Sequence, residues 1–415
     1  MTSTRPPTVI LPSTPVHVQT YYCSHTRSNR SNITETVDRI LGDNAGKPLP
    51  RLPERGDLLI PRATGYGGPK YWAIRLSGQL LQDDQDRILG AIRSGEEAGC
   101  KAYIKGTERT SGLSPHHLGI FFRASNIHSP WVTNDTVQPN RNPQVAAGRK
   151  QHMLELCLAI GDVADQRVQS RIRDLDPETW QAHRASTQRM KAALDQSKLD
   201  LRGVSAADSP NHPVGHVSEF FRFGHLATCS AVTQGQSEKM HLDSHDDRRL
   251  YTTLLVLGHR NQDWDHSQGQ GDLLMPTLGY ALPVYPGDVV LFQPGVIPHL
   301  VKALNPQDAR KRVVITMFTC EPTTDYLNMA GVQIQDRRSK GQRSGAGECP
   351  RCGSTFKDLL EHIKKQHADD RFTAQEMGAT GLCVCSCGKV TLNERGLKLH
   401  RKRHPELHAE EGDSV

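Results

Sequence analysis

Residues 241–257 read HLDSHDDRRLYTTLLVL, and residues 271–302 read GDLLMPTLGYALPVYPGDVVLFQPGVIPHLVK. The first stretch opens with His241 and Asp243, and its apolar, β-branched second half predicts a strand over 251–257. Further short strands are expected at 272–275, 279–285, 288–293, 296–302 and 312–319. Because turn residues and no helices separate these strands, the pattern favours an antiparallel jelly roll over a parallel α/β sheet.

Three side chains in these strands form a candidate metal site. His241 and Asp243 are joined by His299, which lies 56 residues after Asp243. Two imidazoles and one carboxylate are the ligands that fill one face of a non-haem Fe(II) and leave other positions open. A basic residue soon after His299 can supply the counter-charge that a dicarboxylate co-substrate needs. Arg312 is preferred because it begins the apolar run, and the adjacent Arg310 and Lys311 are the alternatives.

The ordered combination of these motifs over about residues 238–320 resembles the 2-oxoglutarate/Fe(II)-dependent dioxygenases. The resemblance implies that His241, Asp243 and His299 ligate Fe(II) and are the catalytic residues. It also implies that the distal carboxylate of 2-oxoglutarate pairs with Arg312, with Arg310 as the rival. Such an enzyme uses O2 to oxidise a C–H bond and releases succinate and CO2.

Within that family, the Gly-Asp-x-x-x-Pro, Leu-Gly-Tyr and Pro-Gly-Asp-Val-Val series over 271–290 resembles the TET/JBP-like branch, particularly its fungal forms. This resemblance implies oxidation of methyl groups on DNA bases, 5-methylcytosine and/or N6-methyladenine. The expected partner is therefore duplex DNA with methylated bases, from which the target base must be flipped out. The Cys-rich segment that precedes the barrel in animal members is absent here, so DNA engagement has to come from other parts of the chain.

Three other interpretations remain open. An AlkB-like repair enzyme would carry a second arginine six positions after the first, but those positions hold Phe318, counted from Arg312, and Thr316, counted from Arg310. A protein (prolyl-type) or small-molecule hydroxylase has the same iron motif and is compatible with fingers that bind protein. A DNA-binding protein with a vestigial barrel is disfavoured because the three ligands and Arg312 are all present.

The composition limits the remaining possibilities. The chain has 415 residues, a net charge of +6 and a pI near 8.8, a mild basic excess that permits nucleic-acid binding. No apolar run approaches 18 residues and the first residues do not form a signal peptide, so a soluble, intracellular protein without a membrane association is expected. With a DNA substrate, the expected location is nuclear.

Five of the ten cysteines are crowded into the C-terminal tail, where zinc ligands are expected. In a first finger, Cys349 and Cys352 are followed after nine residues by His362 and after four more by His367. Thiolates from a knuckle and imidazoles from a helix, expected over 355–366, make a tetrahedral Zn2+ site. The short gap makes this a compact variant of a Cys2His2 finger.

The second finger fits the Cys2His2 pattern more closely. Cys387 precedes His400 by twelve intervening residues, and His404 follows after three. Cys383 is the preferred fourth ligand by spacing, with Cys385 as the alternative. The helix positions that would face bases include Gly396 and Leu399, which cannot read a base edge. Non-specific tethering to duplex DNA is therefore preferred, and protein binding remains the alternative.

Together these features predict an α+β protein with a double-stranded β-helix (jelly-roll) core, flanking helices and small C-terminal zinc-finger modules. The Ser/Thr/Pro/Asn-rich residues 1–55 are expected to form a flexible arm. The dioxygenase domain should span 56–330, with a helical insert at about 143–200 and the motif-bearing barrel at 218–320. A linker at 336–348 should precede finger 1 (349–367) and finger 2 (383–404). The polar residues His245, Asp246 and Asp247 are expected either to line the substrate mouth or to form a solvated turn.

Overall fold

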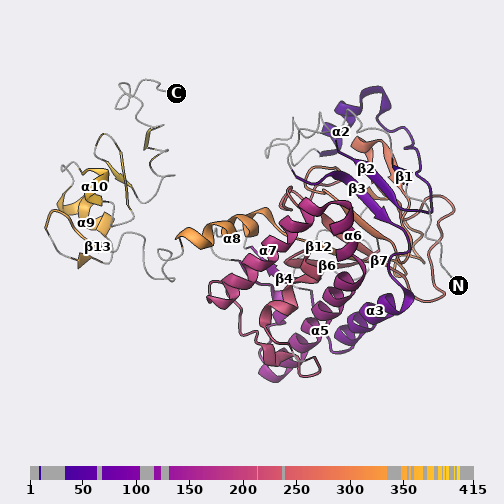
Figure 1. Ribbon diagram of the computed structural model, residues 1–415, viewed down its shortest axis with the longest axis horizontal. Coiled ribbons are helices and arrows are strands. Elements are labelled where there is room, and N and C mark those ends of the chain that lie inside the picture. The colour runs from indigo at the N-terminus through magenta and orange to yellow at the C-terminus, as the bar shows by residue number, and fades with distance from the viewer. Residues whose placement is uncertain are drawn as a thin grey trace. The chain divides into compact units, whose positions relative to one another are not determined.

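A computed structural model of the chain divides into two compact units, Met1–Asn328 and Met329–Val415, which are described separately (Figure 1). The structure describes residues 9–10, 33–62, 68–102, 116–122, 130–212, 214–235, 239–333, 347–352, 355–356, 359–367, 372–377, 382–385, 387, 389–391, 397, 400 and 401. The large unit combines helices with antiparallel sheet, as the sequence predicted.

A large sheet dominates the first unit, and all its pairings are antiparallel except that between β1 and β2. Its strands lie in the order β1 (Val9–Ile10), β2 (Leu58–Pro61), β3 (Tyr71–Leu76), β10 (Val289–Phe292), β7 (Thr252–Leu257), β12 (Val313–Phe318), β6 (Cys229–Gln234), β4 (His116–Phe121) and β5 (Trp131–Val132). The central strands are almost wholly buried, which explains why 252–257 and 313–318 are so rich in apolar and β-branched residues.

A small sheet completes the barrel, with the strand order β11 (Leu300–Val301), β8 (Leu273–Met275) and β9 (Tyr280–Leu282). An isolated antiparallel bridge between His241 and His299 adds the segment around His241 beside β11. From β6 to β12 the chain therefore passes repeatedly between the two sheets. This alternation is the connectivity of a jelly roll and is consistent with the predicted core.

The predicted strands from 251 to 319 all contain strands of the structure, and each observed strand is shorter than its predicted range. The largest difference is at 296–302, where Val296 and Ile297 form a turn and only Leu300 and Val301 belong to β11. Both turn residues donate backbone hydrogen bonds to the carbonyl of Gln293, so they are unavailable to a strand ladder. His299 consequently lies at the start of β11, directly after the turn.

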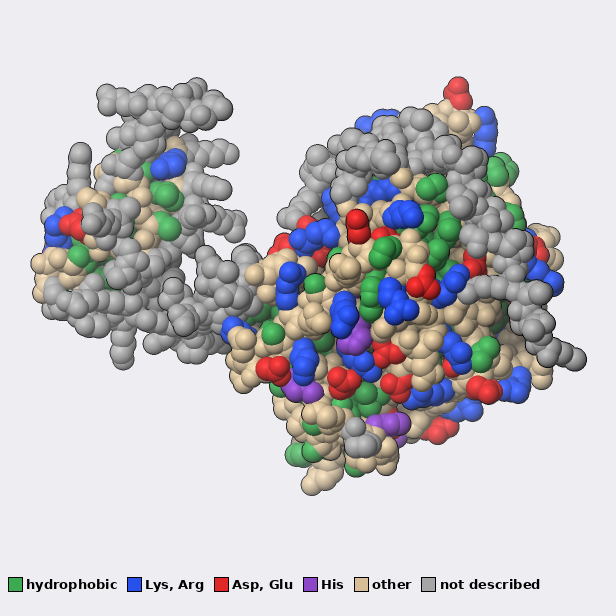
Figure 2. Space-filling model, viewed as in Figure 1, with side chains coloured by type: hydrophobic (Ala, Val, Ile, Leu, Met, Phe, Trp, Pro, Cys, Tyr) green, Lys and Arg blue, Asp and Glu red, His purple; other side chains and the backbone are tan. Residues whose placement is uncertain are grey.

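Helices cover one face of the large sheet (Figure 1). They are α3 (Gln82–Glu97), α4 (Asn134–Val137), α5 (Pro143–Arg167), α6 (Gln169–Leu175) and α7 (Pro177–Asp195), with α8 (Glu321–Gln333) after β12 and short 3-10 turns η3 (Ala206–Asp208), η4 (Val217–Phe221) and η5 (Phe223–His225). Asn142 caps α5 and Asp176 caps α7, each followed by proline at the first helical position. Helices α5, α6 and α7 span residues 143–195, where the sequence led us to expect a helical insert at about 143–200. Basic and acidic side chains intermingle on the face of the unit seen in Figure 2, as on a solvated surface.

The N-terminal arm was predicted incorrectly from residue 33 onward. Helix α2 (Ile33–Leu41) and the turn η2 (Gly42–Asn44) belong to the folded unit, and Leu52 is buried in its core. The amide N–H of Leu52 donates to the carbonyl of Ala281 in β9, which fixes this segment to the small sheet. The amphipathic spacing of α2 outweighs the polar composition around it, because its apolar residues recur on one helix face.

A buried histidine supports strand β7 from the helical layer. His183 of α7 donates from Nδ1 to the carbonyl of Leu226 at 2.7 Å, and its Nε2 accepts the N–H of Tyr251 at 3.1 Å. These bonds require the neutral imidazole. Burial lowers the pKa of His183 from its ordinary value of 6.5 to about 4.

We expect this histidine to make the fold acid-sensitive. Its folded pKa lies below its unfolded pKa, so the unfolded chain binds the proton first and the stability falls as the pH drops from 6.5 towards 4. Between pH of about 7.5 and about 5, His183 should account for a loss of about 2 kcal/mol in the free energy of unfolding. Urea unfolding at both pH values should show a loss that is about 2 kcal/mol larger in the parent chain than in His183→Gln. An equal loss in both chains would contradict the assignment.

The second unit contains two short hairpins and two helices. Its elements are β13 (Gly347–Glu348), β14 (Thr355–Phe356), α9 (Leu359–Gln366), α10 (Ala374–Met377), β15 (Cys383–Val384) and β16 (Val390–Thr391). The helix expected over 355–366 begins only at Leu359, because Thr355 and Phe356 pair with β13. Residues 347 and 348, which were expected to belong to the linker, form that strand. Among the described residues of the whole chain, none of the helices is long and apolar enough to cross a membrane.

Candidate active site

The two predicted iron-binding histidines are held together by the backbone. The N–H of His241 donates to the carbonyl of His299 at 3.0 Å, and the N–H of His299 donates back at 3.1 Å. The N–H of Asp243 donates to the carbonyl of Pro294, so the third residue is fixed to the same turn. The structure thus brings together His241, Asp243 and His299, whose potential ligand atoms all lie within 4.8 Å of one another.

Both imidazoles are oriented for metal binding through Nε2. Nδ1 of His241 lies 2.9 Å from the carbonyl oxygen of Lys239, and Nδ1 of His299 lies 2.9 Å from that of Ile297. A backbone carbonyl can only accept, so each Nδ1 carries the proton and each Nε2 has a free lone pair. Each Nε2 lies 3.9 Å from an oxygen of Asp243. The donor set therefore fits a divalent iron ion, with no rearrangement of the tautomers required.

Burial also sets the charge state around the ligands. It lowers the pKa of His299 to about 4, so this imidazole is neutral and ready to bind a metal at physiological pH. Asp246, three residues after Asp243, is buried and accepts a hydrogen bond from the Thr252 hydroxyl at 2.5 Å. Burial and the nearby Asp243 raise the pKa of Asp246 well above the ordinary range. Asp243 is then the carboxylate of this turn that is suited to bind a cation.

The turn after the ligand pair is not a solvated loop. Asp246 and Asp247 are both buried, and Asp247 forms an ion pair with Arg249 at 2.8 Å. His245 is exposed and lines the cavity, where its ring makes an edge contact with Phe122. Of the two interpretations offered for 245–247, the structure supports a cavity lining for His245 and Asp246.

Arg312 provides a buried positive charge in the same cavity. Its side chain is buried, its Nη1 donates to the carbonyl of Gly235 at 3.0 Å, and its Nε has no hydrogen-bond partner among the described residues. Burial lowers the pKa of Arg312 to about 10, so the guanidinium remains charged at neutral pH. An unpaired buried donor on a cationic fork fits a carboxylate ligand. Arg310 is exposed in the turn before β12 and does not line the cavity, so its predicted role as the alternative is not supported.

One face of β12 forms a wall of the cavity, whose volume is about 310 Å³. Side chains at alternate positions of a strand point to the same face, and here Arg312, Val314, Thr316 and Phe318 all line the cavity. The cavity therefore has a cationic end and an aromatic end. Gly235 is bonded to the Arg312 end and Asp246 bridges to Cys320 at the other end, so the candidate ligands His241 and Asp243 lie between Gly235 and Asp246 in sequence.

The aromatic end was not predicted from the sequence. His117 and Phe121 of β4 line the cavity with Phe318, and the rings of His117 and Phe121 stack with centroids 5.9 Å apart. Phe318 meets Phe121 edge-on at 6.2 Å. The alternation of His117, Gly119 and Phe121 along a short strand was a usable signal for one shared face. Strand β4 pairs with β6, which carries none of the sequence motifs. The motifs therefore gave no indication that β4 lines the cavity.

Helix α2 packs behind the ligand segment. Val37 is fully buried against Leu242, the residue between His241 and Asp243, and Met240 joins the same cluster. The apolar residues of the helix recur at helical spacing, as Ile33, Val37, Ile40 and Leu41. This spacing was the sequence signal for the contact. Leu242 is fixed by this packing, and the candidate ligands on either side of it, His241 and Asp243, line the cavity.

We expect Val37→Asp to weaken iron binding while leaving the ligands intact. A carboxylate at this buried position would separate α2 from Leu242 and free the ligand segment. Loss of groups that orient metal ligands typically costs about 10- to 100-fold in metal affinity, and a reduction of that size is expected. Metal titration followed by calorimetry would measure it. Asp38→Ala, at an exposed position of the same helix, should bind iron like the parent chain; similar affinities for all three chains would contradict the role of α2.

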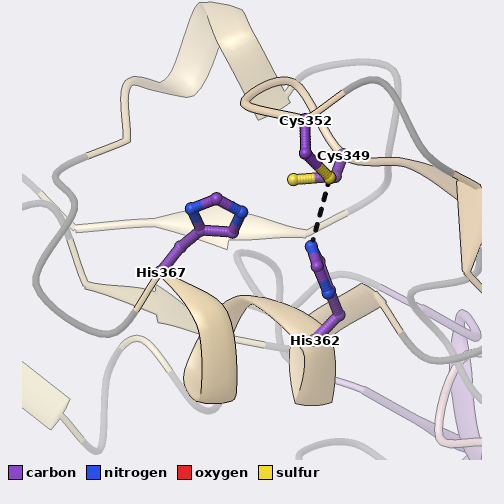
Figure 3. A group of neighbouring side chains, drawn as sticks. All are labelled: Cys349, Cys352, His362 and His367. Atoms are coloured by element: carbon purple, nitrogen blue, oxygen red, sulfur yellow. Dashed lines mark hydrogen bonds between the residues drawn. The ribbon is translucent and has the colours of Figure 1, made fainter.

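The C-terminal unit brings two further groups of candidate metal ligands together. Cys349, Cys352, His362 and His367 form the first group, with the histidines on α9 and directly after it (Figure 3). Sγ of Cys352 lies 3.5 Å from Nε2 of His362. The four residues are those that the sequence spacing selected.

The second group differs from the preferred prediction. It contains Cys385, Cys387 and His400, and not Cys383. The N–H of Cys385 donates to the carbonyl of Lys389, so the hairpin turn places Cys385 beside Cys387, while Cys383 lies further along β15 opposite Thr391. Cys385, the predicted alternative to Cys383, is therefore the cysteine that the structure places beside Cys387 and His400. His404 lies outside the described residues, as do the helix positions 396 and 399.

No protein-family model matches the sequence. No curated protein matches it either. The solved structures that it resembles include one described as NgTET1 in complex with 5mC DNA, with a TM-score of 0.37 and 11% sequence identity. That likeness covers 72% of this chain and 93% of the other. A likeness of this size determines neither fold nor function, and both rest on the strands and side chains of this chain.

Proposed function

We propose that the protein is an Fe(II)/2-oxoglutarate-dependent dioxygenase that oxidises methyl groups on DNA bases, 5-methylcytosine and/or N6-methyladenine. The observation that carries this proposal is the presence of His241, Asp243, His299 and Arg312 around one cavity. When bound, Fe(II) and 2-oxoglutarate supply the O2-dependent oxidation of a C–H bond. The catalytic residues are the three candidate ligands.

The side chains at the two ends of the cavity are proposed to have different roles. Arg312 would bind the distal carboxylate of 2-oxoglutarate through its free Nε and hold the co-substrate at the cationic end. His241 and His299 would hold the metal through Nε2, with their Nδ1 protons fixed on backbone carbonyls. The apolar side chains of β12 exclude water from the space between.

The aromatic end is the proposed place for the base. A methylated base inside a duplex is out of reach of a buried metal, so the base has to be flipped into the cavity. His117, Phe121 and Phe318 offer ring faces and edges there, and stacking on such side chains is the usual means of holding an unpaired base. The sequence resemblance to the TET/JBP-like branch points to the same substrate class.

The C-terminal unit is proposed to tether the enzyme to duplex DNA. Four of its described basic residues, Lys364, Lys365, Lys389 and Arg401, are exposed, so phosphates can reach them. Phosphate contacts give affinity without sequence information, which agrees with Gly396 and Leu399 at positions that would face bases. With this substrate, the proposed location of the protein is the nucleus.

The experiment that tests the proposal is a product analysis. The full-length protein is incubated with Fe(II), 2-oxoglutarate, ascorbate and matched duplexes that carry 5-methylcytosine, N6-methyladenine or no methyl group, and the digested nucleosides are identified by mass spectrometry. Oxidised bases that require both 2-oxoglutarate and the methyl group support the proposal. Turnover on peptides or small molecules with no oxidised base would reject it in favour of a protein or small-molecule hydroxylase.

Phe121→Ala should weaken binding of the methylated base and leave the consumption of 2-oxoglutarate unchanged. Base stacking on an aromatic side chain contributes about 1–3 kcal/mol, which corresponds to roughly 5- to 150-fold in KM for methylated DNA. The consumption of 2-oxoglutarate without DNA should not change, because Arg312 and the metal ligands are untouched. Steady-state kinetics with both readouts would measure this. Phe121→Tyr keeps the ring and should retain the parent KM; an unchanged KM in Phe121→Ala would place the base elsewhere.

A further inference from the structure

The two groups of metal ligands in the C-terminal unit share one hydrophobic core. Its members come from the first knuckle, from α9, from the segment between the fingers and from the second hairpin. They are Cys349, Leu359, Leu360, Ile363, Phe372, Met377, Leu382 and Val390, with Val384 packed against them. Cys349 is both a candidate ligand and a fully buried member of this core. The segment between the fingers is therefore part of the fold and does not behave as a spacer between two separate modules.

Phe372 connects the first ligand group to the rest of the core. Its ring lies perpendicular to that of the candidate ligand His367, with centroids 6.3 Å apart. The guanidinium of Arg351, which lies between Cys349 and Cys352, is 5.1 Å from the centre of the same ring. Arg351 also forms an ion pair at 2.9 Å with Glu376 of α10. The knuckle of the first group is thus attached to α10 and to the core at the same point.

The second ligand group is attached to the same core through its hairpin. Leu382 and Val390 flank this hairpin and are both buried, and Cys385 lies at its turn with little exposure. Sγ of Cys387 is 3.1 Å from Nε2 of His400. Any displacement of the hairpin from Phe372 and Met377 would expose the buried side chains and move Cys385 away from its neighbours.

The donor types suit zinc at both places. The atoms of each group lie within 4.8 Å of one another, close to the edges of roughly 3.3–3.8 Å that a tetrahedron with Zn–N and Zn–S bonds requires. A core of this size is too small to be stable by itself, and units of this kind depend on bound metal for their folding. Since the core is shared, the metal at one group stabilises the packing that positions the other.

We infer that the C-terminal unit binds two zinc ions as one cooperative module, in which loss of the first ion also releases the second. Two independent fingers on a flexible connection would each keep an ion when the other is lost. The inference depends on the ligand groups and their common core, and it is independent of the reaction proposed for the barrel. Zinc content is measured without any turnover, so the two proposals can fail separately.

The test uses the full-length protein and counts metals by mass spectrometry after dialysis against a weak chelator. Cys352→Ala removes an exposed ligand without touching the core. The parent chain should contain two zinc ions, and Cys352→Ala should contain close to none, with the iron capacity unchanged. One zinc ion retained in Cys352→Ala, or fewer than two in the parent chain, would overturn the inference.

A second variant tests the coupling with all candidate ligands in place. Phe372→Ala should convert the release of zinc to a competing chelator from one step into two, whereas Phe372→Leu should retain a single step. Lys365→Gln, which removes an exposed ion pair with Glu361 on α9, serves as the matched control and should behave like Phe372→Leu. Two-step release in the parent chain would also overturn the inference.

Discussion

Replacing Asp243 with alanine should abolish iron binding and reduce any oxidised product to background. Asp243 supplies the one carboxylate of the candidate iron group, and its oxygens lie 3.9 Å from Nε2 of both histidines. Loss of groups that merely orient ligands costs about 10- to 100-fold in metal affinity, so loss of a ligand should cost more than about 100-fold. Iron content after desalting and nucleoside analysis after reaction would provide the two measurements.

Asp325→Ala is the matched control for this change. Asp325 is a half-exposed carboxylate that pairs with Arg249 and does not line the cavity. It should keep the iron content and product yield of the parent chain. The zinc content should be the same in all three proteins, because the C-terminal ligand groups are unaltered. An Asp243→Ala protein that retains iron and turnover would reject the assigned site.

Arg312→Met should remove most of the affinity for 2-oxoglutarate. Truncating one partner of a buried, hydrogen-bonded charge pair costs about 2–5 kcal/mol, equivalent to roughly 30- to 4,000-fold in Kd. Arg312→Lys keeps the charge but loses the planar fork, so it should fall between Arg312→Met and the parent chain. Calorimetric titration with 2-oxoglutarate in the presence of the metal would measure these affinities.

The stability of Arg312→Met distinguishes a ligand-binding role from a structural one. Arg312 makes no ion pair with any described residue, and its burial disfavours the charged form. Methionine can retain the packing against Trp264, whose ring centre lies 5.9 Å from the guanidinium. The Tm of the ligand-free protein should therefore be unchanged or higher. Arg310→Met, at the exposed position, should leave both affinity and Tm unaltered; equal losses in the two variants would contradict the assignment.

The barrel could be predicted from the sequence because its signals are local. Strands such as 252–257 and 313–318 are buried on both faces, so they are continuous apolar runs that stand out from the turns around them. The position of His299 relative to His241 was harder to foresee, since it depends on the turn at 294–298 that shortens β11. The prediction of the candidate metal group depended on the residue types and their order, and not on strand lengths.

Features that depend on packing between distant segments were missed or misjudged. The sequence around α2 is polar, and its contact with Leu242 exists only in the closed barrel. His117 and Phe121 belong to a strand outside the motifs and reach the cavity through pairing of β4 with β6. The choice between Cys383 and Cys385 depended on the register of one hairpin. The number of residues between the cysteines does not show which of them lies in a strand and which in the turn.

The backbone bridge between His241 and His299 has a consequence for how the protein matures. The two residues belong to segments that meet only after the intervening strands have entered both sheets. Such non-local pairing forms late, since the loop between the partners must close first. Partly folded chains would therefore present separate histidines with low affinity for a metal ion, and newly synthesised molecules would bind the proposed iron only once the barrel is complete.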